Sequence, residues 1–289
     1  ATNAKTDLTI NPTPNDVHVG EKSVYVYSAA PQSLGGKIIN HSNIVMDKNN
    51  GYGIYSSQDS ENYGDINLTS GVGNIGVYST QGMGRNHGTI TVGPSNVTNK
   101  EYGIGMATGY YDDNPASPTY GQTSNQGTIE NYGTIEVSKP NSIGMYAVGT
   151  GSKAVNYNTI DLSGDNTIGM YIDRGATGEN WGTIKTTVNG LKSVKGIYVA
   201  NGSYVKNYGT IAISATDLKS AGIWTDKSEN VEENAEGINS VTGVNQKGTS
   251  TPTMKVATAD DMKEVGGVTV KVPPRTPSAT VTDVKGNII

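Results

Sequence analysis

NYGTIEV at residues 131–137 and NSIGMYA at residues 141–147 decide the fold, because variants of both phrases recur along the chain. The first phrase begins at an asparagine, which recurs at Asn40, Asn62, Asn86, Asn131, Asn156, Asn180 and Asn207. The steps between these asparagines are 22, 24, 45, 25, 24 and 27 residues, and the step of 45 is predicted to span two units. The glycine of the second phrase follows each asparagine after 13 to 17 residues. Two separate phrases therefore share one period of about 25 residues, as in a solenoid.

Each unit is predicted to contain at least two short strands. In the first phrase Ile135 and Val137 are both apolar and two positions apart, which is the alternation of a strand. Gly, Asn, Ser and Asp separate the strands, and these residues favour turns. No segment shows a helical period, which disfavours helical solenoids. The predicted fold is all-β, a right-handed parallel β-helix of about seven to eight coils with a small β-rich C-terminal segment.

Stacked coils place equivalent residues above one another at about 4.8 Å. The opening asparagines are predicted to bond amide to amide in a ladder: Asn62, Asn86, Asn131, Asn156, Asn180 and Asn207. The residues after the second-phrase glycines are predicted to fill the interior: Ile54, Val77, Ile104, Met145, Met170, Ile197 and Ile223. One predicted aromatic stack follows the ladder: Tyr63, His87, Tyr132, Tyr157, Trp181 and Tyr208. A second lies in the other phrase: Tyr55, Tyr78, Tyr146, Tyr171, Tyr198 and Trp224.

The composition supports a narrow core and excludes several kinds of site. The 289 residues include 38 Gly and no Phe, and only 34% are hydrophobic, too few large apolar side chains for a wide interior. Without Cys there is no disulfide and no thiolate ligand. A net charge of -5 disfavours nucleic-acid binding. Because no metal-binding or nucleotide-binding motif has the required context, we expect no metal and no cofactor.

Three segments are expected from the limits of the repeat. Residues 1–35 would form an N-terminal coil or cap, and residues 36–228 the β-helix repeats. Residues 229–289 comprise an acidic loop and a C-terminal β segment with Val-Thr alternation divided by prolines. The repeat is interrupted by an insertion loop at residues 107–124, and insertions in solenoids commonly carry binding.

The insertion holds the candidate binding residues. Tyr110, Tyr111 and Tyr120 could stack on a sugar or a partner surface, while Asp112 and Asp113 accept hydrogen bonds. The alternative is a solvated connecting loop without a partner. A third hypothesis, a β-helix polysaccharide-degrading enzyme, has only Asp112 and Asp113 with Arg85 or Arg174 as candidates. Adjacent aspartates on a loop seldom form a catalytic pair, so we expect no enzyme and assign no catalytic residue.

The paired phrases resemble the passenger repeats of large type V autotransporter adhesins, most closely those of fusobacteria, over residues 36–228. The resemblance implies a monomeric β-helix on the bacterial surface, exported through its own C-terminal barrel. It also implies attachment to host-cell receptors, protein or glycan, or to partner bacterial surfaces. The chain shows no barrel strands and no signal peptide, so we expect a passenger fragment. The alternative within the same family is a structural stalk that presents a binding tip elsewhere.

Overall fold

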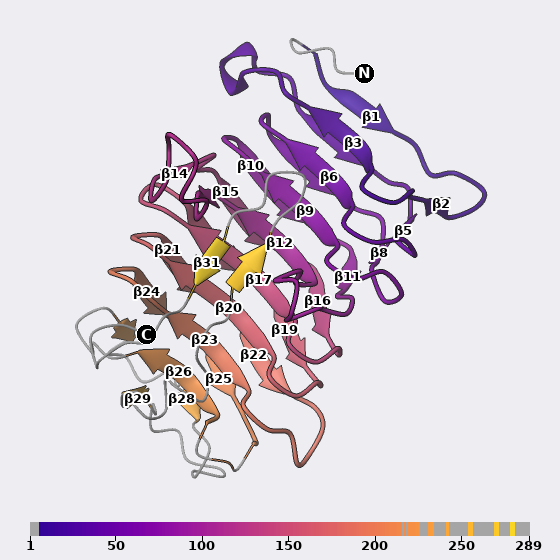
Figure 1. The fold of residues 1–289 in the computed structure, drawn as a ribbon. Coiled ribbons are helices and arrows are strands. Elements are labelled where there is room, and N and C mark those ends of the chain that lie inside the picture. The colour runs from indigo at the N-terminus through magenta and orange to yellow at the C-terminus, as the bar shows by residue number, and fades with distance from the viewer. Residues whose placement is uncertain are drawn as a thin grey trace.

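The computed structural model of the chain is a parallel β-solenoid in which three long sheets run along one axis (Figure 1). The structure describes residues 6–215, 217 and 219–225, together with the backbone of five short strands beyond them. Each coil contributes one strand to each sheet, and neighbouring coils pair in parallel. The all-β parallel solenoid predicted from the repeat is confirmed.

Sheets A, B and C each have nine strands. Sheet A is formed by β1 (Leu8–Ile10), β4 (Ile38–Asn40), β7 (Ser60–Asn62), β10 (Met83–Asn86), β15 (Thr128–Asn131), β18 (Lys153–Asn156), β21 (Thr177–Asn180), β24 (Tyr204–Asn207) and β27 (Val231–Glu233). Sheet B is formed by β2 (Val17–His18), β5 (Ile44–Val45), β8 (Ile66–Asn67), β11 (Thr89–Thr91), β16 (Thr134–Val137), β19 (Thr159–Leu162), β22 (Thr183–Thr186), β25 (Thr210–Ala212) and β28 (Val241–Thr242). Sheet C is formed by β3 (Val24–Ser28), β6 (Tyr52–Ser56), β9 (Ile75–Ser79), β12 (Ile104–Thr108), β17 (Ile143–Val148), β20 (Ile168–Asp173), β23 (Lys195–Val199), β26 (Ala221–Thr225) and β29 (Met254–Val256).

The remaining elements lie outside these sheets. They are a 3-10 turn, η1 (Gln32–Leu34), and two antiparallel pairs, β13 (Tyr110–Tyr111) with β14 (Thr123–Ser124) and β30 (Thr269–Lys271) with β31 (Ser278–Thr280). Over the described range, no helix is long and apolar enough to cross a membrane.

The first and last strands of sheets A, B and C pair with the neighbouring coils. Within the predicted N-terminal coil or cap, residues 1–35, strands β1, β2 and β3 pair with β4, β5 and β6. At the other end β27, β28 and β29 pair with β24, β25 and β26. The rest of the predicted C-terminal segment, residues 229–289, lies outside the described residues apart from β30 and β31.

The structure extends the predicted unit in one respect and corrects it in another. Each coil has three strands, which agrees with the prediction of at least two; the third forms because the residues before the ladder asparagine make a sheet A strand whose sequence varies from coil to coil. The step of 45 residues is a single coil, since Asn86 pairs directly with Asn131. The extra residues leave the coil instead, mainly in the β13–β14 hairpin between β12 and β15.

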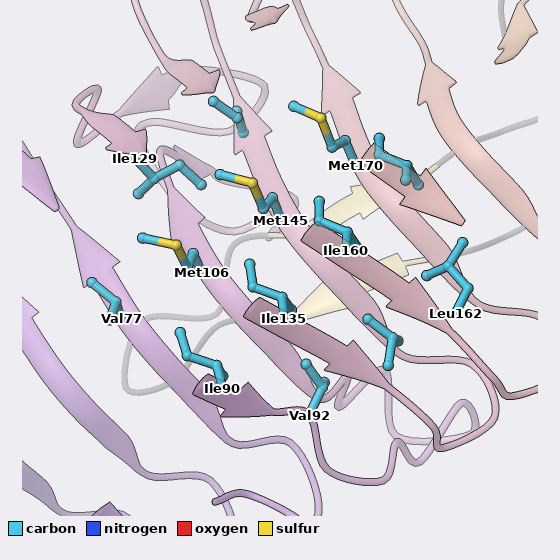
Figure 2. Packing of buried hydrophobic residues seen from close by; sticks show 14 of the residues in the cluster. Val77, Ile90, Val92, Met106, Ile129, Ile135, Met145, Ile160, Leu162 and Met170 are labelled. Atoms are coloured by element: carbon cyan, nitrogen blue, oxygen red, sulfur yellow. The ribbon is translucent and has the colours of Figure 1, made fainter. Parts of the chain in front are cut away.

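The interior is filled by rows of aliphatic side chains from successive coils. Figure 2 shows Val77, Met106, Met145 and Met170 following one another on sheet C. The predicted interior position Ile104 is wrong: Met106 takes that place and pairs with Val77 and Met145, whereas Ile104 joins a separate cluster on the outer face of sheet C. The local sequence Gly-Ile-Gly-Met offers two glycines, and a strand shift of two residues leaves the apolar alternation unchanged.

The ladder asparagines end the sheet A strands and are buried. Each Nδ2 donates to the Oδ1 of the next coil at 2.8–3.1 Å, from Asn40 through to Asn207. The same Nδ2 also donates to the carbonyl oxygen two residues further along its own chain, as from Asn131 to Gly133 at 3.0 Å. One side chain therefore shapes the turn toward sheet B and joins two coils.

The glycine of the second phrase is required by close contact between coils. A Cβ at Gly144 would lie 2.6 Å from the carbonyl oxygen of Gly169 and 3.1 Å from Cγ2 of Ile160. Equivalent glycines from β6 to β23 face the next coil in the same way. The recurring glycine therefore marks the line along which successive sheet C strands approach too closely for a side chain.

Gly144→Ala is expected to lower the free energy of unfolding by about 1–3 kcal/mol, because the added methyl group must push two coils apart. Chemical denaturation followed by far-ultraviolet circular dichroism would measure this change. Gly20→Ala is the matched control, since its Cβ would meet only the side chain of Ser23, with Oγ at 3.2 Å. Equal stability loss in the two variants would contradict the contact argument.

Candidate functional site

The first aromatic column lies at the corner between sheets A and B and is exposed. Ring centroids are 4.5 Å apart for Tyr63 and His87 and 4.6 Å for Tyr132 and Tyr157, with nearly parallel planes. The column also includes His41, stacked on Tyr63, and a stacked pair of Trp181 and Tyr208. Because rings inside the column cover each other's faces, they present mainly edges to solvent. A flat sugar would find few open ring faces here.

Carboxylates on the outer face of sheet A hold this column. The phenol of Tyr63 donates to Glu61 at 3.0 Å, and the indole Nε1 of Trp181 donates to Glu179 at 3.1 Å. Lys37 and Arg85 pair with Glu61 at 3.1 and 3.6 Å. Burial alone would raise the pKa of Glu61, but the hydrogen bonds from Lys37 and Tyr63 outweigh it, so the pKa is lowered. These charged and aromatic groups stabilise the stack of coils.

The second aromatic column differs from the first because it is buried from Tyr78 onward. Tyr146, Tyr171, Tyr198 and Trp224 are 0% exposed and form a cluster separate from the interior. Their rings are tilted, with centroids 5.2–5.3 Å apart along the tyrosines. Burial raises the pKa of the Tyr146 and Tyr171 phenols well above the ordinary range. These four rings therefore offer no open binding platform, whereas Tyr55, the first member of the column, is only half-buried.

The predicted insertion loop is a β-hairpin at the corner between sheets C and A. Tyr110 and Tyr111 in β13 lie opposite Ser124 and Thr123 in β14. Ala107 and Thr108 belong to β12, so the excursion begins at Gly109. Figure 1 shows the β14 end of the hairpin projecting from the edge of the stacked coils. The hairpin is therefore an ordered side structure carried by the solenoid.

The five candidate binding residues have different environments. Tyr120 is 55% exposed at the tip. The carboxylate of Asp112 accepts hydrogen bonds from Thr119 Oγ1 at 2.6 Å and from the backbone N–H of Asn114, and hydrogen bonds from Ser117 and Thr119 lower its pKa. Asp113 lies 3.8 Å from Lys100 Nζ. Asp112 thus shapes the loop, while Tyr120 and Asp113 face outward.

Arg174 connects the hairpin to a later coil through a contact with Tyr111 that was not predicted from the sequence. Its guanidinium lies 3.7 Å from the ring centroid of Tyr111, and its Nε is 3.8 Å from Oδ2 of Asp173. Arg174 has a φ of 52° in the turn after β20, a backbone conformation that non-glycine residues seldom adopt. The only sequence signal was a charged Asp-Arg pair in a turn where other coils have small or polar residues.

Asp173 is a buried carboxylate beside this contact. Its Oδ1 accepts a hydrogen bond from Asn201 Nδ2 at 2.6 Å, while Oδ2 has no hydrogen-bond partner within the described part of the chain. Burial is the largest influence on Asp173 and exceeds the effects of Arg174 and Asn201, raising its pKa to about 6.

The residues considered for an enzymatic site were Asp112 and Asp113 with Arg85 or Arg174, and the structure does not bring all of them together. Arg174 lies beside the hairpin, but Arg85 is held on sheet A between Glu61 and Glu130. Across the described residues, no group of three or more His, Cys, Asp or Glu side chains could hold a metal ion.

Comparison with known proteins supplies the remaining observation. The family model of the BigA third pectate lyase-like domain matches residues 2–182, more than half of the 289 residues. This chain belongs to that family. BigA is an autotransporter-type adhesin, so membership in the BigA third-domain family supports a passenger-domain fragment of a surface-displayed bacterial protein. No curated protein and no solved structure matched the chain.

Proposed function

We propose that this chain is a passenger segment of a type V autotransporter adhesin that attaches the bacterium to other surfaces by non-covalent binding. The observation that carries the proposal is the match to a domain of an adhesin. The partner is a host-cell receptor, protein or glycan, or the surface of another bacterium. The segment acts as a monomer, without a cofactor and without catalysis. Its relatedness to the adhesin repeats of fusobacteria belongs to the same proposal.

The binding element in this proposal is the β13–β14 hairpin. It departs from the regular coils, it is ordered by its own hydrogen bonds, and Arg174 anchors its base through Tyr111. Tyr120 and Asp113 then offer an exposed ring and a carboxylate to a partner. The regular coils hold this element at a fixed place on a rigid support.

Replacing residues 112–122 with a tight Asn-Gly turn is expected to abolish binding of the purified chain to cells, because the exposed tip is removed while β13 and β14 remain. Adhesion to epithelial and bacterial cell layers would be measured by fluorescence, with circular dichroism as the test of folding. Tyr63→Ala, an exposed aromatic substitution at another corner, serves as the control and is expected to bind like the natural chain.

Two other results would decide against the proposal. A correctly folded chain that binds no cells would favour a purely structural stalk. Cleavage of a polysaccharide by the purified chain would instead favour the enzymatic hypothesis.

A further inference from the structure

A groove of about 330 Å³ opens on the outer side of sheet C in the first three coils. It is lined by the rings of Tyr27 and Tyr55 together with Val24, Ser57, Thr80 and Gln81. Its volume lies at the lower end of the range for small-molecule sites. Strands β3 and β6 supply part of the groove, and the residues that directly follow β3, β6 and β9 supply the rest, where the chain turns toward sheet A.

The tyrosines of the groove are arranged differently from the exposed aromatic ladder. The Tyr27 and Tyr55 rings are 5.5 Å apart and inclined by 33°, whereas Tyr63 and His87 are 4.5 Å apart and inclined by 5°. Tyr27 is 54% exposed. Tyr55 is half-buried and also packs against Tyr52 and Tyr78 at 5.1 Å, so Tyr27 supplies most of the open ring surface. An open aromatic face is the surface against which the C–H face of a pyranose can pack.

The polar groups of the groove suit hydroxyl ligands. Ser57 Oγ donates to the carbonyl oxygen of Ala30 at 2.5 Å, and Thr80 Oγ1 donates to that of Ser56 at 3.4 Å, so both hydroxyl oxygens can still accept. Gln81 is exposed, and its amide makes no hydrogen bond among the described residues. An amide offers both donors and an acceptor, which matches the mixed donor and acceptor character of sugar hydroxyls.

The groove carries no charge of its own. None of its lining residues is acidic or basic. A carboxylate or sulfate group would therefore lose hydration on entry without gaining a cationic partner. A neutral ligand meets no such penalty.

The groove also adjoins the insertion hairpin. The ring of Tyr78 lies edge to face with Tyr55 at 5.1 Å, and the Tyr78 hydroxyl donates to the carbonyl oxygen of Gly109 at 3.0 Å. Gly109 begins the excursion that leads to β13. A chain of ligand units leaving the groove would thus pass toward the hairpin along the same corner of the solenoid.

We propose that this groove binds a neutral oligosaccharide, with Tyr27 and Tyr55 packing against sugar rings and Gln81 hydrogen bonding to their hydroxyls. The proposal deepens the adhesive function by assigning a ligand class, and it rests on that function only for its biological meaning. The binding itself is a property of coils 1 to 3 and is independent of the hairpin tip.

Isothermal titration of the full chain with cellotetraose, chitotetraose and β-1,4-galactotetraose, and with tetragalacturonate as the charged probe, tests the proposal. At least one neutral probe is expected to bind, and tetragalacturonate at least tenfold more weakly. Tyr27→Ala is expected to reduce the affinity about tenfold, as truncation of an anchoring aromatic ring commonly does. Gln81→Ala is expected to reduce it less, since a single exposed amide is removed.

Tyr63→Ala at the corner between sheets A and B is the matched control, because Tyr63 is also an exposed tyrosine, 44% against 54% for Tyr27, but lies outside both the groove and the hairpin. The proposal is overturned if no neutral probe binds, if tetragalacturonate binds as tightly as the neutral probes, or if Tyr27→Ala retains full affinity. These outcomes are separate from cell adhesion. A chain that adheres through its hairpin but binds none of the probes would refute the groove and leave the adhesive function intact.

Discussion

Asn131→Ala is expected to lower the free energy of unfolding by about 3 kcal/mol, because a buried ladder loses its central member. Asn131 Nδ2 donates to Asn156 Oδ1 at 2.9 Å and to the carbonyl oxygen of Gly133 at 3.0 Å, and its Oδ1 accepts from Asn86 Nδ2 at 3.1 Å. Alanine leaves the Asn156 oxygen buried without that donor and removes one of two donors from the Gly133 carbonyl, which still accepts from the Thr159 backbone N–H at 3.4 Å. A buried group that loses its partner costs about 1–3 kcal/mol.

Urea denaturation and amide hydrogen exchange would measure the effect, and exchange should rise most in the coils that contain β10, β15 and β18. Asn67→Ala is the control, since Asn67 is exposed and bonds only locally to Thr69. A stability loss as small as that of the control would mean that the amide ladder is a consequence of coil stacking and contributes little to the stability of the stack.

Much of the fold could be predicted because stacking turns long-range contacts into a local period. Asn86 and Asn131 are 45 residues apart and yet touch, and the repeated phrase marks both of them. The period did not distinguish a second unit from an excursion. It also left the choice between Ile104 and Met106 open to error, since both follow a glycine.

The candidate site was less predictable, since it combines residues that no repeat relates. Arg174 follows β20 and Tyr111 follows β12, two coils earlier. The two residues meet only because the hairpin extends along the corner past the coil that contains β17. The groove joins Tyr27 to Gln81 through the stacking of three coils and depends on how far two rings tilt. Ring tilt and loop direction follow from packing at the corner, and single residues in the sequence carry little information about either.

The burial of Asp173 has a consequence for stability that depends on pH. Because its pKa is raised from 3.8 to about 6, the folded chain holds the proton more tightly than the unfolded chain. The resulting stabilisation is fully present below about pH 4 and is lost as the pH rises through about 6, a difference of about 3 kcal/mol. Glu61 and Glu179 act in the opposite direction and at lower pH, since their pKa values are lowered.

Asp173→Asn is therefore expected to raise the free energy of unfolding by about 2 kcal/mol at pH 8, because it removes an unfavourable buried charge and keeps an oxygen for Asn201. Below pH 4 the advantage should disappear, as the natural carboxyl is then neutral. Denaturation curves between pH 3 and pH 8 would be compared for both chains.

Two further variants separate the charge from other effects of substitution. Arg174→Ala removes the nearest cation, 3.8 Å away, and should steepen the loss of stability between about pH 4 and pH 7. Asp113→Asn alters a carboxylate at the surface and should change stability little at any pH. If Asp173→Asn follows the pH dependence of the natural chain, the buried carboxylate is not the group that titrates. The Arg174 contact would then stabilise the hairpin base through its packing on Tyr111 alone.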